Sequence, residues 1–297
     1  MKFNRLYFLD ENRQIAMCSF NVLEKLDEDS QISLLYYFPT ANIRAKNIVK
    51  WVRRFHAFQS SNKTRLIVCT DVATEARWLR TFGIEAIFAN QNMNCSEHDF
   101  HIMQQVEDPT YDAVYAAQLK SFKRIELAEK IDRIYVITYK SGTVADLHSA
   151  YPTMLHADFN TTFLDHHEVC SIYNRANCGL ALSWREGAMW ASMEYQLAGL
   201  PVVSTPSRGG RMHYYDPETW VIAEPTASGV RSAVDKIVAR GLPRTFVRER
   251  ALEKVNNERR RFHERVLLNA NEMGIAGVMD FERVWGQGIA QNSSIIE

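Results

Sequence analysis

Short apolar runs alternate with amphipathic stretches along most of the chain. In the first hundred residues the runs cover 32–38 (ISLLYYF), 66–70 (LIVCT) and 84–89 (IEAIFA), lengths that suit buried strands. Helical patterns follow the first two, one ending near Phe58 and one over 72–81, with Asp71 as its expected N-cap and Gly83 at its end. Before them, two apolar runs around an Asp-Glu-Asn turn within residues 5–20 predict a hairpin.

The same alternation restarts after a polar, proline-containing stretch at 104–111 (QQVEDPTY), which we interpret as a domain boundary. Strands alternating with helices imply parallel pairing with crossover helices. We therefore predict an α/β protein of two Rossmann-like domains facing a central cleft, a shortened one over 1–106 and a second over 107–297. In the second domain strands are expected at 111–117, 133–138, near Met154, and at 179–183, 201–205 and 220–224, and helices at about 121–130, 144–151, 168–176, 188–198, 228–240 and 243–271.

Charge and cysteine content narrow the possible partners and location. Lys plus Arg and Asp plus Glu both number 35, so the chain has no overall positive charge with which to hold nucleic acid. Its five cysteines are widely spaced and form no C-x-x-C pair, which favours reduced thiols in a cytoplasmic protein. We find no signal peptide and no run of roughly 20 apolar residues. The sequence therefore predicts at most peripheral membrane contact.

Residues 180–211 (LALSWREGAMWASMEYQLAGLPVVSTPSRGGR) carry the most informative chemistry. A strand ends near Ser183, a loop carries Glu186, and a helix expected to start near Ala188 carries Glu194 before Gly199 ends it. In a helix, eight positions separate two carboxylates by roughly 12 Å, too far for an acid–base pair. The helix N-terminus between them would suit a diphosphate. Glu194 could then hold ribose hydroxyls and Glu186 the hydroxyls of a sugar.

At these residues the sequence resembles the retaining glycosyltransferases of the GT-B fold, particularly family 4. Their signature is a Glu, seven residues and a second Glu, then small-Gly-Leu-Pro-Val-Val, which stands here as Glu186 to Glu194 followed by AGLPVVST. Upstream, YNRANCGLALS resembles the segment leading into the first Glu, and YDAVYAAQLKSFKRIELAEKI resembles the family's opening strand and helix. Lys123 matches the Lys of a basic pair that contacts the donor phosphates. Gln118 stands where an Arg is usual, so that Lys120 or Arg124 would have to substitute.

The resemblance implies transfer of a sugar from a nucleoside-diphosphate sugar to an acceptor hydroxyl, with retained configuration and with neither metal nor cofactor. The acceptor would be a glycan or a lipid-linked glycan, as in polysaccharide or lipopolysaccharide assembly. In the N-terminal half, where the likeness is weak, Asn94 and His98 are candidates for acceptor contact. The implied catalytic residues are Glu186 and Lys123. The implied donor-binding residues are Glu194, Gly187, Ala188, Met189, Trp190, Arg124, Leu164, Gly209 and Gly210.

The residues also leave alternatives. A nucleotide-sugar epimerase on the same fold, or a non-catalytic subunit that binds nucleotide sugars, would share much of this pattern. The pair His166-His167 could indicate a metal site, but a polar loop near the nucleotide base is the preferred interpretation because further ligands are not apparent. Arg208 and Arg211 either lie on the surface or reach a substrate.

Overall fold

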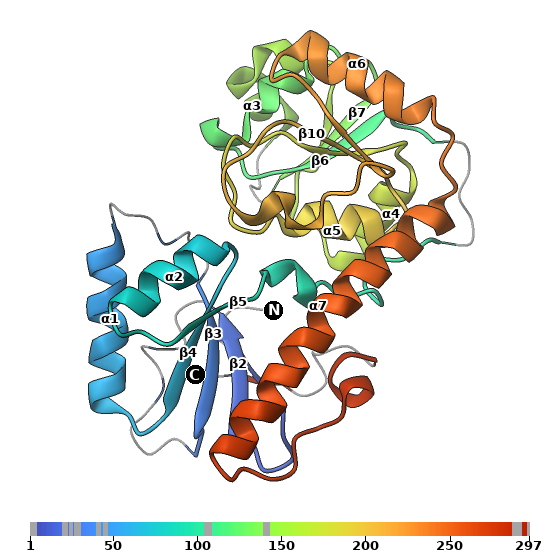
Figure 1. The fold of residues 1–297 in the computed structure, drawn as a ribbon. Coiled ribbons are helices and arrows are strands. Elements are labelled where there is room, and N and C mark those ends of the chain that lie inside the picture. The colour runs from blue at the N-terminus through green and yellow to red at the C-terminus, as the bar shows by residue number, and fades with distance from the viewer. Residues whose placement is uncertain are drawn as a thin grey trace. The chain divides into compact units, whose positions relative to one another are not determined.

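The structure is a computed structural model that describes residues 5–19, 23, 26, 31–39, 43, 47–103, 109–138, 143–286 and 293–295. The chain divides into two compact units, coloured by position in Figure 1. Unit 1 combines Met1–Cys95 with Val255–Glu297, and unit 2 is Ser96–Lys254. Among the described residues, each unit is built on its own sheet of six strands.

The sheet of unit 1 is mainly parallel, with strand order β12-β1-β2-β3-β4-β5. Strands β2 to β5 run parallel to one another, while β1 pairs antiparallel with both β2 and β12. The predicted hairpin and buried strands are thereby confirmed. The elements are β1 (Arg5–Phe8), β2 (Ile15–Ser19), β3 (Leu34–Phe38), α1 (Ile48–Ser61), β4 (Arg65–Thr70), α2 (Ala73–Thr81), β5 (Ala86–Phe88), the 3-10 helix η3 (Gln91–Asn94), the π-helix η8 (Glu282–Gly286) and β12 (Ser293–Ile295).

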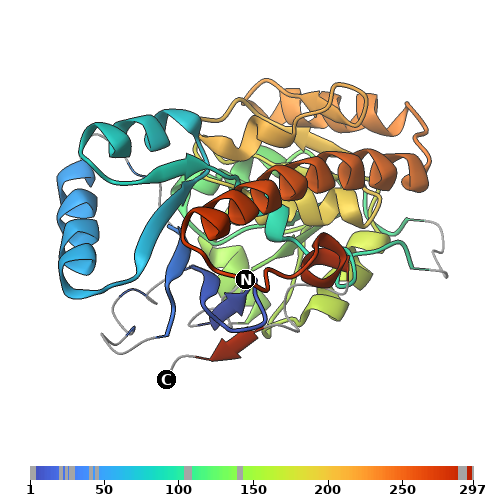
Figure 2. The same cartoon turned by 60° about the horizontal axis from the view of Figure 1, so that its bottom comes forward.

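Helices cover both faces of this sheet, which explains why β3 is apolar at every position. Tyr36 and Tyr37 are neighbours on β3 and so point to opposite faces. The ring of Tyr37 packs edge-on against Phe55 of α1, with centroids 5.9 Å apart. The ring of Tyr36 packs against Phe262, at 5.0 Å, and its hydroxyl accepts a hydrogen bond from Asn269 at 2.7 Å. Both partners lie on α7 (Arg244–Glu272), and Figure 1 shows the C-terminal part of this helix beside the strands of unit 1. Figure 2 shows the same elements from a second direction.

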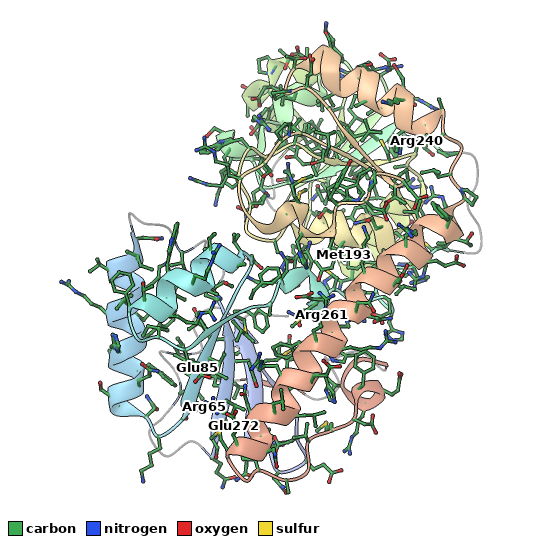
Figure 3. The ribbon with its side chains drawn as sticks, viewed as in Figure 1. Arg65, Glu85, Met193, Arg240, Arg261 and Glu272 are labelled. Carbon is green, nitrogen blue, oxygen red and sulfur yellow. The ribbon has the colours of Figure 1, made fainter. Side chains whose placement is uncertain are left out.

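Charged side chains also attach the end of α7 to unit 1. Arg65, at the start of β4, forms ion pairs with Glu85 at 2.8 Å and with Glu272 at 3.1 Å. Figure 3 shows the three side chains gathered at one end of the sheet. The ion pairs are partly exposed and contribute little stability by themselves. They place the last turn of α7 beside β4.

The sheet of unit 2 is parallel throughout, with order β11-β10-β9-β6-β7-β8. Strands β7 and β8 follow β6 on one side of the sheet. Strand β9 pairs with the other side of β6, and β10 and β11 follow outward from β9. This is the 3-2-1-4-5-6 order of the Rossmann fold. The elements are β6 (Ala113–Ala116), η4 (Ser121–Lys123), η5 (Ile125–Ala128), β7 (Ile134–Ile137), α3 (Val144–Ala150), η6 (Pro152–Met154), β8 (Asp158–Phe159), α4 (His166–Asn174), β9 (Gly179–Ala181), α5 (Trp190–Leu197), β10 (Val202–Ser204), η7 (Gly210–Tyr214), β11 (Trp220–Ile222) and α6 (Ala227–Val238).

The division into units differs from the predicted boundary at 106/107. It lies at 95/96, and residues 255–297 join unit 1 although the sequence pattern placed them in the second domain. An amphipathic pattern shows that a helix has an apolar face but not which sheet that face covers, and Phe262 covers β3. Most of the predicted polar link, 104–108, lies outside the described residues, as does most of the stretch before α1.

Two local predictions are wrong and a third is displaced along the chain. Asp71 does not cap α2, whose N-cap is Val72; its carboxylate instead accepts a hydrogen bond from the backbone of Gln91 at 2.9 Å. The short strand predicted near Met154 is β8, which begins four residues further on; Met154 itself ends a 3-10 helix, because Pro152 suits a helix start and cannot donate to a sheet. The helix expected at 121–130 is two 3-10 turns, since Arg124 between them is left-handed, with φ 52° and ψ 50°.

Candidate active site

The sheet of unit 2 has a switch point between β6 and β9, where its two halves meet. Val114 of β6 pairs with Gly179 of β9. A side chain at position 179 would place its Cβ 2.2 Å from the ring of Tyr195, so glycine allows α5 to lie close against the sheet. The hydroxyl of Tyr195 accepts a hydrogen bond from the backbone of Ala116, at 2.7 Å. The loops that leave β6 and β9 therefore start side by side at the carboxyl edge, where doubly wound sheets bind ligands.

These two loops bring Lys123 and Glu186 together. Nζ of Lys123, at the end of η4, bonds Oε1 of Glu186 in the loop after β9, and both side chains are mostly buried. The Oγ of Ser183 donates to the same carboxylate oxygen at 2.9 Å. The backbone of Glu186 is held as well, because its N–H donates to the carbonyl of Arg208 at 3.0 Å. The two residues predicted to be catalytic thus meet at the switch point, although 63 positions separate them.

Arg124 follows Lys123 in a left-handed conformation that a residue with a Cβ adopts at some cost. Its side chain offsets that cost by three hydrogen bonds. The guanidinium donates to the carbonyl of Leu182, through Nε at 2.7 Å and also through Nη2, and to Oγ1 of Thr205 at 2.6 Å. Burial lowers its pKa. Arg124, predicted to bind the donor, therefore also joins the loops after β9 and β10.

Arg211 is fully buried behind this edge, which the sequence did not indicate. Its Nη1 donates to the carbonyl and the hydroxyl of Ser183, both at 2.8 Å, and its Nη2 donates to the carbonyl of Thr205 at 2.5 Å. Burial lowers the pKa of Arg211 to about 10, so it stays charged at neutral pH. A chain of hydrogen bonds thus runs from Arg211 through Ser183 to Glu186. Two cations are thereby linked to one carboxylate, Lys123 directly and Arg211 through Ser183.

Glu194 occupies the second turn of α5 and is half-buried. Its carboxylate accepts a hydrogen bond from the hydroxyl of Tyr173 at 3.1 Å. Burial raises the pKa of Glu194 to about 7, because desolvation outweighs that hydrogen bond and the nearby His166. Phe100 stacks on Tyr173, with ring centroids 5.8 Å apart. Glu194 therefore changes its charge near neutral pH.

The other predicted donor residues lie around the start of α5 and the turn after β10. Met189 is the buried N-cap of α5, so the helix begins two residues later than predicted. Leu164 is half-buried just before α4, whose N-cap is Asp165. Gly209 has a φ of 115° and opens η7, in a region open mainly to glycine. Three of the remaining residues are half-buried in the loop before α5 or in its first turn: Gly187, Ala188 and Trp190. Gly210 is buried at the start of η7.

The two predicted acceptor residues belong to different units. Asn94 lies in unit 1, is 5% exposed, and its side-chain amide has no hydrogen-bond partner among the described residues. His98 lies in unit 2 and is exposed. Nearby, the ring of His166 pairs with Asp99 at 3.0 Å, and His167 is exposed. No group of three potential metal ligands occurs in the part of the chain that the structure describes.

A shallow pocket opens beside Glu186. It is lined by Trp184, Pro206, Ser207 and Arg208 and has a volume of about 360 Å³. The loops after β9 and β10 form its floor, because the N–H of Arg208 donates to the carbonyl of Trp184 at 3.0 Å. Trp184 is 39% exposed, which leaves part of its indole available for contact. Neither Trp184 nor this pocket was singled out from the sequence.

Comparison with known proteins identifies the fold. No family model and no curated protein sequence matches the chain. Among solved structures, a sucrose-phosphate synthase from Thermosynechococcus elongatus aligns with a TM-score of 0.56 and 14% identity, over 88% of this chain and 72% of that one. Anabaena HepE, solved in complex with UDP, aligns at 0.54 and 11%, over 80% and 79%. A glycosyltransferase from Rickettsia africae aligns at 0.53 and 11%, over 76% and 72%.

At such low identity these likenesses speak for the fold alone. They agree with the two parallel-sheet α/β units described above. The expected fold class is thereby confirmed: the chain has the α/β fold of the GT-B glycosyltransferases to which it is structurally similar.

Proposed function

We propose that this protein is a glycosyltransferase that moves a sugar from a nucleoside-diphosphate sugar to an acceptor hydroxyl. The observation that carries the proposal is the contact between Lys123 and Glu186 at the switch point of a 3-2-1-4-5-6 sheet. Ligands of doubly wound folds bind at that edge. The structural likeness to glycosyltransferases supports the same reading, and HepE was solved with UDP.

The charges at this edge suit a diphosphate leaving group. Lys123, Arg124 and Arg211 outnumber the carboxylates that act on them, those of Glu186 and Glu126. As the bond between the sugar and the diphosphate breaks, negative charge develops on the phosphate oxygens, and a nearby fixed cation stabilises it. We assign that role to Lys123. We assign Arg124 and Arg211 mainly to fixing the loops, because each donates several hydrogen bonds to carbonyl and hydroxyl groups of the loops after β9 and β10.

The two glutamates take different parts of the donor in this proposal. Glu186 holds hydroxyls of the transferred sugar, and its hydrogen bond from Ser183 fixes its orientation. Glu194 lies eight residues further on and accepts hydrogen bonds from the ribose, which its ionised form does best. We further propose retention of configuration and no required metal, as the resemblance to family 4 implies. The acceptor would be a glycan or lipid-linked glycan of a polysaccharide pathway.

A transfer assay tests this proposal. The protein is incubated with a panel of labelled nucleoside-diphosphate sugars and candidate acceptors, and both released nucleotide and glycosylated product are measured. Replacing Glu186 by Ala should lower turnover at least a hundredfold, as loss of one transition-state contact typically does. The matched control is Glu126→Ala, because Glu126 is an exposed glutamate on η5, close to Lys123 in sequence.

The products separate the proposal from its alternatives. Nucleotide released together with glycosylated acceptor supports transfer. Interconversion of the nucleotide sugar without release indicates an epimerase, and binding of nucleotide without any turnover indicates a non-catalytic subunit. Full turnover by a folded Glu186→Ala protein would remove that residue from the mechanism.

A further inference from the structure

Positive charge is concentrated in one part of unit 1, although the whole chain has equal numbers of cations and acids. Residues 48–83 contain seven Lys and Arg but only two acids, Asp71 and Glu75. Of these two acids Glu75 is buried and Asp71 is partly buried, so the segment keeps an excess of positive charge at its surface. Five of the cations are exposed, Arg54 is half-buried, and Arg65 is paired with Glu85 and Glu272; the exposed ones are Lys50, Arg53, Lys63, Arg77 and Arg80.

Large apolar side chains are exposed among these cations. Val49 on α1 is 56% exposed, Trp78 on α2 is 44% exposed, and Phe82, just after α2, is 48% exposed. Folding therefore leaves a tryptophan and a phenylalanine partly in water in a segment that carries excess positive charge. An exposed apolar patch of this kind commonly marks a binding surface.

The two helices that carry these side chains are neighbours in unit 1. Their inner sides share one hydrophobic core, to which Phe55 and Phe58 contribute from α1 and Leu79 from α2. At the outside, the ring of His56 contacts the carbonyl of Phe82 at 3.1 Å. Figures 1 and 2 both show α1 and α2 as neighbours. We call this surface the α1/α2 face and define it by Val49, Lys50, Arg53, Arg77, Trp78 and Phe82.

We propose that the α1/α2 face binds the surface of a membrane that contains anionic lipids. Anionic headgroups attract Lys and Arg, and each such residue near the surface contributes roughly a fivefold gain in binding. Trp and Phe insert at the boundary between headgroups and acyl chains, where an aromatic ring is well accommodated. Cations together with exposed apolar side chains favour a lipid surface over a polyanion in water. A soluble polyanion would bind the cations but would make no use of the exposed Val49 and Phe82. This binding is peripheral, since among the described residues no helix has the length and apolar content to cross a bilayer.

Another helix offers an internal control. The outer side of α7 also exposes leucines, Leu267 at 44% and Leu268 at 57%. Exposed charges of both signs surround them, including Glu264 and Arg265. A protein surface that exposes apolar side chains but has no excess positive charge should not bind an anionic membrane. Matched substitutions on the two helices therefore separate the proposed face from a general effect of lost surface residues.

Vesicle flotation tests the proposal with the full-length protein. One set of vesicles is pure phosphatidylcholine and the other contains phosphatidylglycerol as well. Two variants remove the charge (Arg53→Gln with Arg77→Gln) or the apolar contact (Trp78→Ser with Phe82→Ser). Their controls on α7 are Arg261→Gln with Arg265→Gln, and Leu267→Ser with Leu268→Ser. Thermal melting verifies that each variant is folded.

The expected result is binding to the anionic vesicles only. The charge variant should bind about 25-fold more weakly, at roughly fivefold per cation, and the apolar variant at least tenfold more weakly, whereas both controls bind like the original protein. The proposal is overturned if the anionic vesicles do not bind the protein, or if the α1/α2 variants bind as well as their controls. It is also overturned if soluble polyphosphate binds the protein equally well and the apolar variant leaves binding unchanged.

Discussion

Glu194 should make the stability of the protein depend on pH between about 5 and 8. Burial raises its pKa to about 7 from an ordinary value of 4.5. The carboxyl therefore ionises more readily in the unfolded chain than in the folded one, and the folded state binds more protons in this range. The stabilisation is fully present below pH 4.5 and is lost as the pH rises through 7. Each unit of pKa shift corresponds to about 1.4 kcal/mol.

The size of the effect follows from these two pKa values. At pH 5.5 the raised pKa of Glu194 contributes roughly 2 kcal/mol to the free energy of unfolding, and at pH 8.5 it contributes roughly zero. Replacement by Gln removes the titrating group while keeping an oxygen that can accept the hydrogen bond from Tyr173. The free energy of unfolding of the original protein should therefore fall by about 2 kcal/mol more than that of Glu194→Gln between these two pH values.

Urea denaturation at pH 5.5 and pH 8.5, followed by tryptophan fluorescence, measures this difference. A second measurement is the chemical shift of the Glu194 carboxyl carbon in protein labelled with ¹³C-glutamate, which gives its pKa directly. If the two proteins change in parallel with pH, or if the carboxyl titrates near 4.5, then desolvation does not control this glutamate. The reasoning that links burial in α5 to its charge would then be refuted.

Three further substitutions test the packing around both units by thermal melting. Gly179→Ala should cost about 1 to 3 kcal/mol, because the added methyl would overlap the ring of Tyr195; an unchanged melting temperature would contradict the close approach of α5. Phe262→Ala should cost about 3 to 5 kcal/mol by opening a cavity against β3, and loss of no more than about 0.5 kcal/mol would show that α7 does not cover that sheet. Arg211→Met should cost about 2 to 4 kcal/mol by leaving buried oxygens such as that of Ser183 without a donor, and a variant as stable as the original would refute its role in joining the loops.

Much of the fold was predictable because strand and helix patterns are local. The apolar runs at 32–38 and 66–70 became β3 and β4, and Gly199, with φ 79°, follows the end of α5 as expected. The packing of α7 against the sheet of unit 1 was not predictable in the same way. Its apolar side covers β3, more than two hundred residues earlier in the chain, and no local pattern identifies that partner.

The candidate site shows the same distinction. Glu186 and Lys123 were found because a spaced motif and a basic segment are visible in the sequence, and the structure joins them. The sequence does not decide whether Arg211 lies on the surface or reaches a substrate, because residue type alone does not distinguish a buried arginine from an exposed one. The carbonyls of Ser183 and Thr205, which accept hydrogen bonds from Arg211, lie in the loops after β9 and β10. These two strands become neighbours only in the folded sheet. The left-handed turn at Arg124 was equally hidden, because nothing in its residue type suggests it.

The central claim is that the switch-point edge of unit 2 binds a nucleoside diphosphate through Lys123, and calorimetric titration tests it most directly. The protein is titrated with UDP, GDP, ADP and CDP in turn, and then Lys123→Met and the control Lys130→Met are titrated with the best of them. Lys130 is an exposed lysine of the same segment, and its ammonium bonds the hydroxyl of Ser228. We expect one nucleotide to bind, at least tenfold more weakly to Lys123→Met and unchanged to Lys130→Met. Absence of binding by all four nucleotides, or equal affinity of the two variants, would contradict the account.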